Sequence, residues 1–327
     1  MTSCISANIN INMNTFEEMK LANCLSGPMF FLNKLKNAPK NVALKFRCKK
    51  RIKLLDALVL STKESIITPL KTAEVSLIVS FTTYSKRIHD AHLVVESIAQ
   101  QTLKPHRIIL WLDENEFTLE TITEALKMQV KRGLEVRFCP NFRSYKKLIP
   151  TLQHFPDANV ITIDDDILYP PDMIEILLKE HQMFPEYVLG NRVHRIRLNG
   201  HGEVLPYINW EWEIKRGGAD DLVFITSGGG TLFPSKCFSR EVMNSDVFLE
   251  ICPNADDVWF KAMSLLNGVK SKKVNDDRAF SERFLPIPGS QDIALFKYNV
   301  DECGNDKQLK AVFEKYDLFK YLKYEAV

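Results

Sequence analysis

Two short acidic segments contain the residue types that could do chemistry in this chain, and the first is Asp164-Asp165-Asp166. It directly follows residues 159–163, an apolar, β-branched run that predicts a strand. Because side chains alternate along a strand, an Asp-x-Asp at its end points Asp164 and Asp166 to the same side. Carboxylates at the carboxyl end of a strand in an open α/β sheet are hard oxygen ligands for Mg²⁺ or Mn²⁺. We therefore expect Asp164 and Asp166 to hold a divalent cation that bridges substrate phosphates.

These carboxylates also have a purely structural interpretation. They precede Pro170-Pro171, and acidic side chains favour the N-terminus of a helix. A cap needs only one Asp, however, and three crowded carboxylates repel one another unless a cation is present. The metal site is the preferred interpretation, and the helix cap is its alternative.

The second acidic segment is Asp256-Asp257, at the start of a helix that continues through Val258-Trp259-Phe260. Paired carboxylates in this position suit a general base, and a helix N-terminus would keep Asp257 ionised at neutral pH. A pair of N-cap residues is an equally weighted alternative.

A glycine run, Gly228-Gly229-Gly230, lies between the two acidic segments. Glycine lets a backbone approach a ligand closely, although glycine runs are also common in ordinary loops. No Lys-Ser or Lys-Thr pair follows, so the run is not a Walker-type phosphate loop.

Strands and helices alternate through the part of the chain that contains the first acidic segment. The alternation predicts an α/β fold, with a mostly parallel sheet and helices on both faces. After residue 185 the alternation blurs until a helix expected over residues 258–267. The earlier strands are expected over residues 75–81, 107–112, 134–138 and 159–163, and the helices over residues 88–101, 119–132, 145–154 and 172–181.

The composition is ordinary for a globular protein, with 45% hydrophobic residues, 26% charged residues and a net charge of +2. This balance does not favour nucleic acid as a partner. The seven cysteines include no Cys-x-x-Cys pair, and we interpret them as reduced thiols of a cytosolic protein. Residues 1–20 lack the apolar core of a secretory signal, and the apolar runs are too short to span a bilayer. We therefore expect a cytoplasmic protein.

Residues 1–74 are expected to form an N-terminal extension with helical character. The basic run over residues 45–53 is followed by an apolar run over residues 54–60. A basic, partly amphipathic helix can lie on an anionic membrane surface, which would place the protein peripherally on the inner membrane face. A solvated helical face is the alternative.

Taken in order, the strand with its three Asp residues, Trp210-x-Trp212, the glycine run and the Ala-Asp-Asp-Val-Trp segment resemble glycosyltransferases of the GT-A fold. The stretch from the glycine run to Trp259 is similar to the β-1,3-type galactosyltransferases and their relatives. The resemblance covers about residues 75–300. It implies a GT-A-like domain over residues 75–327, divided into a nucleotide-sugar-binding half (75–184) and an acceptor half (185–327).

The resemblance also implies an activity. It is the metal-dependent, inverting transfer of a sugar from a nucleotide-diphosphate sugar, with a UDP-sugar as the expected donor. The acceptor hydroxyl would belong to a glycan or a lipid-linked acceptor, in surface polysaccharide or glycolipid synthesis. Asp257, supported by Asp256, would be the general base. Asp166 would bind Mn²⁺ or Mg²⁺ directly, and Asp164 would hold the ribose or a metal-bound water.

Further donor-site residues follow from the same resemblance. Asp113, at the end of the second expected strand, would read the nucleobase. Lys146 and Lys147 would neutralise diphosphate charge. The remaining donor-site candidates are Thr82, Thr83, Arg87 and Asp165.

Two other classes of protein fit parts of the pattern. A sugar-phosphate nucleotidyltransferase also uses a parallel sheet, paired Asp residues and Mg²⁺, but it would need a glycine-rich loop after the first strand, and residues 81–87 contain no glycine. A non-catalytic carbohydrate-binding protein could stack sugars on its tryptophans, but it would not need two acidic clusters. Both remain alternatives to the glycosyltransferase.

Overall fold

The computed structural model describes residues 27–71, 75–290, 299 and 303–323, and of residues 27–41 it describes the backbone only. The contacts divide the chain into two units, Met1–Lys50 and Arg51–Val327.

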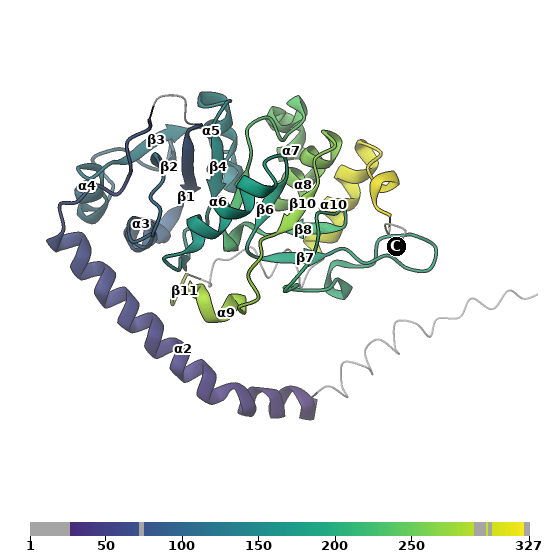
Figure 1. The fold of residues 1–327 in the computed structure, drawn as a ribbon, viewed down its shortest axis with the longest axis horizontal. Coiled ribbons are helices and arrows are strands. Elements are labelled where there is room, and N and C mark those ends of the chain that lie inside the picture. Colours follow the sequence, from purple (N-terminus) through teal and green to yellow (C-terminus); the bar gives the residue numbers. More distant parts are fainter. Residues whose placement is uncertain (1–26, 72–74, 291–298, 300–302, 324–327) are drawn as a thin grey trace, which may run out of the picture. The chain divides into compact units, whose positions relative to one another are not determined.

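The helix α2 (Gly27–Ser61) runs across this division and is drawn as the long purple helix in Figure 1. Its later part belongs to the large unit because Leu55 and Val59, four residues apart on one helix face, are buried. The connection after α2 is also held there, since the Ile66 N–H donates to the Arg132 carbonyl at 3.0 Å. The contact-based division at Lys50 thus differs from the one expected after residue 74, because residues 51–71 already contribute to the core of the large unit.

Seven strands form the central sheet in the order β10-β6-β9-β4-β1-β2-β3. Parallel pairing joins β1 to β2 and β4, β2 to β3, and β6 to β10. Only β9 reverses direction within this sheet, because it pairs antiparallel with both β4 and β6. The strands are β1 (Leu77–Thr82), β2 (Arg107–Asp113), β3 (Leu134–Cys139), β4 (Asn159–Thr162), β6 (Val188–Gly190), β9 (Thr231–Phe233) and β10 (Ser271–Lys273).

Two short ribbons accompany the sheet. One joins β5 (Ile167–Leu168) to β11 (Leu285–Pro286), and the other joins β7 (Val193–Arg195) to β8 (Val223–Ile225). Helices flank the central sheet (Figure 1), so the expected α/β class with a mostly parallel sheet is confirmed. The helices are α3 (Ala91–Ala99), α4 (Glu124–Val130), α5 (Ile149–His154), α6 (Met173–Met183), α7 (Ser245–Ile251), α8 (Asp256–Leu266), α9 (Phe280–Arg283) and α10 (Gly304–Lys315).

The expected strands and helices lie close to the observed ones, and the differences have local causes. The helix expected over residues 119–132 is shorter, because the Thr123 hydroxyl accepts a hydrogen bond from the Leu126 N–H and starts α4 at Glu124. The helix expected over residues 145–154 divides into the 3₁₀ helix η2 (Arg143–Lys147) and α5, with Pro150 in the first turn of α5.

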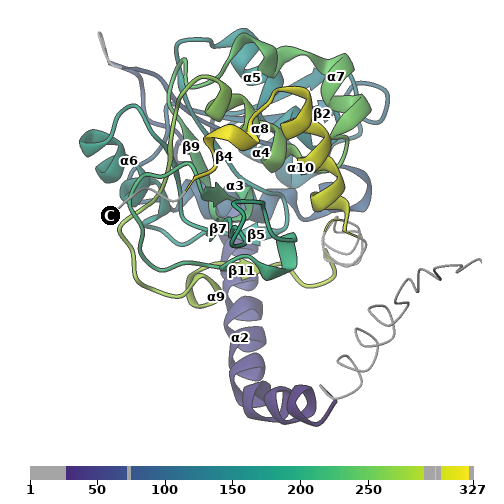
Figure 2. The same ribbon diagram turned by 90° about the vertical axis from the view of Figure 1, so that its right-hand side faces the viewer.

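One hydrophobic cluster is built mainly from the second half of the chain. Tyr145 stacks on Phe248 with ring centroids 4.1 Å apart, and Trp259 of α8 meets Tyr316 edge-on at 5.8 Å, where α8 packs against α10 (Figure 2). This packing fixes α8, which begins with the second acidic segment, relative to η2, which carries Lys146 and Lys147.

Two further expectations concern cysteines and membranes. The five cysteines within the described residues, Cys48, Cys139, Cys237, Cys252 and Cys303, are free, whereas Cys4 and Cys24 lie outside that part of the chain. Among the described helices, none combines the length and the apolar character needed to cross a lipid bilayer.

Candidate functional site

The three Asp residues of the first acidic segment lie in a turn and not in a strand. β4 ends at Thr162, and the turn over residues 164–166 leads into β5. Strand alternation was expected to orient these side chains. It does not, because they do not lie in a strand. The turn is instead held by backbone contacts: the Asp164 N–H donates to the Tyr169 hydroxyl at 2.8 Å, and the Asp166 carbonyl accepts from the Ile287 N–H at 2.8 Å.

Asp165 is the buried member of this turn. Its Oδ2 accepts from the Thr83 hydroxyl at 2.6 Å, and its Oδ1 accepts from Arg87 Nη1 at 2.7 Å. Burial raises the pKa of Asp165 and outweighs the opposing effect of Arg87. Both carboxylate oxygens of Asp165 are thus engaged by the protein, which gives this residue a positioning role. Its expected contact with the nucleotide-sugar donor stays a prediction.

Arg87 joins this turn to a segment far along the chain. Its Nη2 lies 3.2 Å from Asp166 Oδ2 and 2.7 Å from the carbonyl oxygen of Ser290. Arg87 is itself buried, so its charge is balanced by the two carboxylates and not by water. Thr83 and Arg87 thus contact the acidic turn, and their expected contact with the donor stays a prediction.

Lys147 connects the two acidic segments. Its Nζ lies 3.0 Å from Asp164 Oδ1, 2.8 Å from Asp256 Oδ2 and 2.6 Å from the Ser227 hydroxyl oxygen. Burial lowers the pKa of Lys147, but the surrounding carboxylates outweigh burial and hold that pKa well above its ordinary value. The lysine therefore stays cationic, and it brings Asp164 and Asp256 into one site.

Asp257 completes this site from the first turn of α8. Ser227 donates to Asp257 Oδ1 from its backbone N–H at 3.2 Å and from its hydroxyl at 2.8 Å. Burial, followed by the charge of Asp256, raises the pKa of Asp257 to about 7. Burial and the like charge of Asp256 thus oppose the ionised form of Asp257 that was expected at neutral pH.

The helix-cap alternatives are not what the structure shows. The N-cap residue of α8 is Ala255, and no side chain caps that helix end. Asp172 occupies the N-cap position of α6, so the acidic turn does not cap that helix either. The carboxylates are instead engaged by Lys147, Arg87 and Ser227.

The glycine run approaches the acidic turn at one position only. A Cβ atom at Gly228 would lie 3.4 Å from Asp164 Oδ2. At Gly229 a Cβ would lie 2.7 Å from the backbone nitrogen of Arg192, and Gly230 has a φ of +81° with Met173 Sδ 2.9 Å from such an atom. Gly229 and Gly230 are thus required by the packing of the chain on itself, and Gly228 is the glycine that faces the site.

Asp113, Lys146 and Thr82 form a separate group at the ends of β1 and β2. Lys146 Nζ lies 3.9 Å from Asp113 Oδ2, and the other oxygen of Asp113 accepts from the Asn115 N–H at 2.9 Å. The Thr82 hydroxyl donates to the Trp111 carbonyl at 2.8 Å. β1, β2 and β4 are parallel, so their carboxyl ends share one edge of the sheet, which is where ligands bind in open α/β sheets.

The tryptophans and His194 serve mainly the core. Trp111, Trp210 and Trp259 are buried, and each indole N–H donates to a protein oxygen, so these rings cannot stack on a sugar. Burial lowers the pKa of His194 to about 3. Its ring is therefore neutral, and the buried tryptophans weaken the carbohydrate-binding alternative.

The donor atoms around Asp164 and Asp166 fit a divalent cation. Their side chains are 31% and 13% exposed, and both offer hard carboxylate oxygens. Within the described residues no group of three His, Cys, Asp or Glu side chains is arranged to hold a metal ion. A cation here would thus need further oxygens from substrate phosphates, which is the usual way that Mg²⁺ is held.

Two residues of the site were assigned no role from the sequence. Ser227 orients Asp257 and accepts from Lys147, and its position directly before the glycine run was a usable signal. Tyr169 is fully buried and holds both the Asp164 N–H and, at 3.3 Å, the Gly228 carbonyl. Nothing in the sequence around Tyr169 distinguishes it from a core tyrosine.

No protein-family model and no curated protein matches this chain. One match among solved structures is a mannosyltransferase from Pyrobaculum calidifontis in complex with GDP-Man and Mn²⁺, with 15% sequence identity. The alignment covers 84% of this chain and 74% of that chain, with a TM-score of 0.45. A likeness of this degree assigns no role to any residue here, so the roles rest on the contacts described above.

Proposed function

We propose that this chain is a metal-dependent, inverting glycosyltransferase that uses a nucleotide-diphosphate sugar. The observation that carries the proposal is the position of Lys147, whose ammonium contacts both Asp164 and Asp256. It brings a candidate diphosphate site and a candidate base into one site at the edge of the sheet.

The donor would lie along the carboxyl ends of β1, β2 and β4. Asp164 and Asp166 would hold Mn²⁺ or Mg²⁺, which when bound offsets negative charge on the departing diphosphate. Arg87 and Lys147 contact these carboxylates, and in the proposal they would also neutralise charge on the diphosphate. Asp113 would bind the nucleobase at the end of β2, Lys146 would neutralise diphosphate charge, and Thr82 and Thr83 would contact the base or a phosphate.

Asp257 would act on the acceptor. The acceptor oxygen attacks the anomeric carbon, the bond from that carbon to the diphosphate oxygen breaks, and the nucleoside diphosphate leaves with the electron pair. Asp257 takes the proton of the acceptor hydroxyl, and Ser227 holds the carboxylate in place with two hydrogen bonds. Attack from the face opposite the leaving group inverts the anomeric configuration.

The wider setting is part of the same proposal. Residues 75–184 would bind the nucleotide sugar, with a UDP-sugar as the expected donor, and residues 185–327 would bind a glycan or lipid-linked acceptor. The protein would act in the cytoplasm, in surface polysaccharide or glycolipid synthesis. The exposed Phe46, Lys49 and Lys53 of α2 would contact an anionic membrane surface.

A donor panel tests the function directly. The protein is incubated with UDP-, GDP- and dTDP-sugars and Mn²⁺, and the release of nucleoside diphosphate is measured. We expect release with one donor class and its loss on chelation. Release of pyrophosphate from a nucleoside triphosphate and a sugar phosphate would instead identify a nucleotidyltransferase. Sugar binding with no turnover of any donor would identify a carbohydrate-binding protein.

A further inference from the structure

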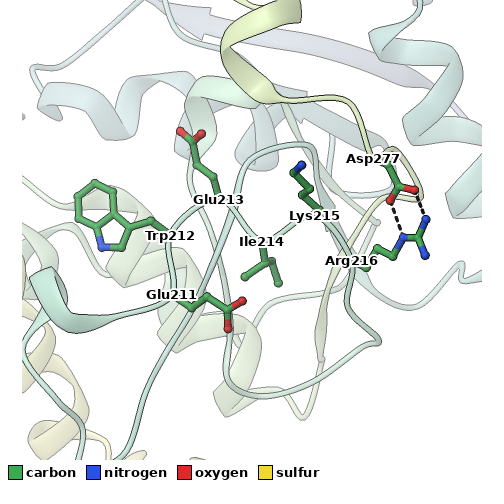
Figure 3. Close-up of a pocket in the computed structure, with 7 residues that line it drawn as sticks. All are labelled: Glu211, Trp212, Glu213, Ile214, Lys215, Arg216 and Asp277. Carbon is green, nitrogen blue, oxygen red and sulfur yellow. Dashed lines mark hydrogen bonds and ion pairs between the residues drawn. The ribbon is translucent and has the colours of Figure 1, made fainter. Parts of the chain in front are cut away.

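A groove of about 620 Å³ runs along residues 211–216 and is completed by Asp277 (Figure 3). Figure 3 shows Trp212 at one end of the groove and the ion pair of Arg216 and Asp277 at the other. The volume lies in the range of small-molecule sites.

The groove offers one aromatic face among charged groups of both signs. Trp212 is half-buried, and its indole N–H donates to the Tyr207 carbonyl at 3.2 Å, which fixes the ring. Glu211 and Glu213 are exposed, whereas Ile214 is buried. The Trp212 ring also packs on His194 at 4.9 Å and on Tyr207 at 5.3 Å, which holds it in place. An aromatic ring and carboxylates in one groove suit a polyhydroxylated ring, because the C–H face of such a ring packs on an indole and its hydroxyls donate to carboxylates.

The backbone at Glu213 is held in an unusual conformation. Its φ is +51°, a left-handed value that costs energy for a residue with a side chain. The Glu213 N–H donates to His194 Nδ1 at 3.0 Å, and because His194 is buried and neutral this acceptor persists at physiological pH. Such strain persists where surrounding structure enforces it, and it concentrates at ligand sites.

Glu213 also connects the groove to the candidate active site. Its Oε1 lies 3.0 Å from Arg192 Nε, and the Arg192 carbonyl accepts from the Thr226 N–H at 3.1 Å. The Arg192 backbone also packs against Gly229 of the loop whose Ser227 holds Asp257. The groove is thus joined to the side of the site where the base lies.

We infer that this groove is a saccharide subsite that binds a sugar ring of the acceptor, stacked on Trp212 and hydrogen-bonded to Glu213. This inference rests on the proposed function and adds the recognition of the acceptor to it. Lys215 and Arg216 lie in the groove together with Glu211 and Glu213, so it lacks the uniform positive charge that nucleic acid needs, and a lipid chain would need apolar walls that the exposed groove residues do not supply.

Transfer kinetics test the subsite. In Trp212→Leu and Glu213→Gln we expect the acceptor KM to rise on the order of tenfold, the effect of losing about 1.4 kcal/mol of binding. Hydrolysis of the donor in the absence of acceptor should stay unchanged in Trp212→Leu, because the Trp212 ring contacts Tyr207 and His194 and neither acidic segment. Glu250→Gln is the matched control, since this exposed glutamate lies on α7 outside the groove. An unchanged acceptor KM in both groove variants would overturn the inference.

A binding measurement keeps the inference testable without turnover. Because Trp111, Trp210 and Trp259 are buried, acrylamide quenching of tryptophan fluorescence reports mainly on Trp212. A panel of methyl hexosides and disaccharides is added to each protein. At least one sugar should protect the fluorescence of the wild type from acrylamide quenching and should not protect that of Trp212→Leu. Protection without any release of nucleoside diphosphate would keep the subsite and reject the proposed function. Absence of protection by every sugar would overturn the subsite.

Discussion

Ser227 donates two hydrogen bonds to the same oxygen of Asp257, from its backbone N–H at 3.2 Å and from its hydroxyl at 2.8 Å. The carboxylate is therefore oriented by a loop that lies outside its own helix. The Ser227 N–H also approaches Asp257 Oδ2, at the longer distance of 3.4 Å, so Oδ2 is the less engaged oxygen and the one suited to accept a proton.

We expect Asp257→Asn to lower turnover by roughly two to four powers of ten, the usual share of general base catalysis, with donor affinity little changed. Asn keeps the size and hydrogen bonding of Asp but lacks its basicity. Turnover and donor affinity should be measured together in Asp257→Asn and Asp256→Asn. If only Asp256→Asn were inactive, the roles within the pair would be reversed. Normal turnover in both variants would remove the support for an inverting mechanism.

The rate should depend on pH through Asp257. Its pKa is raised to about 7, and a base must be deprotonated, so kcat/KM should rise with pH and level off above about pH 7. Lys147 lowers this pKa and Asp256 raises it. Lys147→Met should therefore move the acid limb of the profile to higher pH, and Asp256→Asn should move it to lower pH. Lys146→Met is the control and should leave the acid limb in place. An acid limb that also stays in place in Lys147→Met and in Asp256→Asn would contradict the assignment of Asp257 as the base.

Activity should require a divalent cation held by Asp164 and Asp166. Asp166→Ala and Asp164→Ala should each abolish most turnover without unfolding the protein, and chelation should do the same to the wild type. Calorimetric titration of Mn²⁺ in the presence of nucleoside diphosphate should show binding that Asp166→Ala loses. Full turnover of Asp166→Ala in excess chelator would show that the acidic turn holds no catalytic metal.

Asp165 should contribute more to the free energy of unfolding than an exposed, paired carboxylate such as Asp157 does. Asp165→Ala leaves the buried Arg87 and Thr83 without a shared acceptor, and breaking a buried ion pair costs about 3 kcal/mol or more. Asp157→Ala, which removes an exposed pair with Lys236, should cost less than about 1 kcal/mol. Urea unfolding followed by circular dichroism measures both, and equal losses would contradict the positioning role of Asp165.

The basic face of α2 should bind anionic vesicles at low salt. Each lysine near such a surface contributes about 1 kcal/mol, so changing Lys45, Lys49, Lys50 and Lys53 to Gln should release the protein. The matched control changes four exposed lysines around α10, Lys307, Lys310, Lys315 and Lys320. Co-sedimentation with phosphatidylserine vesicles measures the effect. A wild type that stays in the supernatant at low salt would reject the membrane contact.

The first half of the fold could be predicted because its strands are buried on both faces. β1, β2 and β4 read as continuous apolar runs for that reason, and helical periodicity fills the segments between them. The short β6, β9 and β10 have three residues each, too few to carry a pattern that distinguishes a strand from a loop.

The acidic residues of the candidate site could be singled out from the sequence, and the contacts that orient them could not. Carboxylates in a cluster are visible in a sequence, because their residue type already implies a cation or a proton acceptor. Ser227 and Tyr169 act through geometry that only the folded chain creates, and the same residue types elsewhere are ordinary loop or core residues. The pKa of Asp257 likewise depends on burial and on Lys147, which no spacing reveals.

The antiparallel strand β9 has a consequence for the order in which the strands of the sheet pair during folding. Pairing of β1 with β2 brings Thr82 to Trp111, whereas pairing of β4 with β9 brings Thr162 to Thr231 across a longer stretch of chain. The entropy cost of closing a loop grows with its length, so we expect the β4–β9 pair to form after the β1–β2 pair. β4 itself reaches β1 across a still longer stretch, since Leu77 pairs with Asn159, so both neighbours of β4 are expected to join it after the β1–β2 pair has formed, and the acidic turn after β4 is completed late.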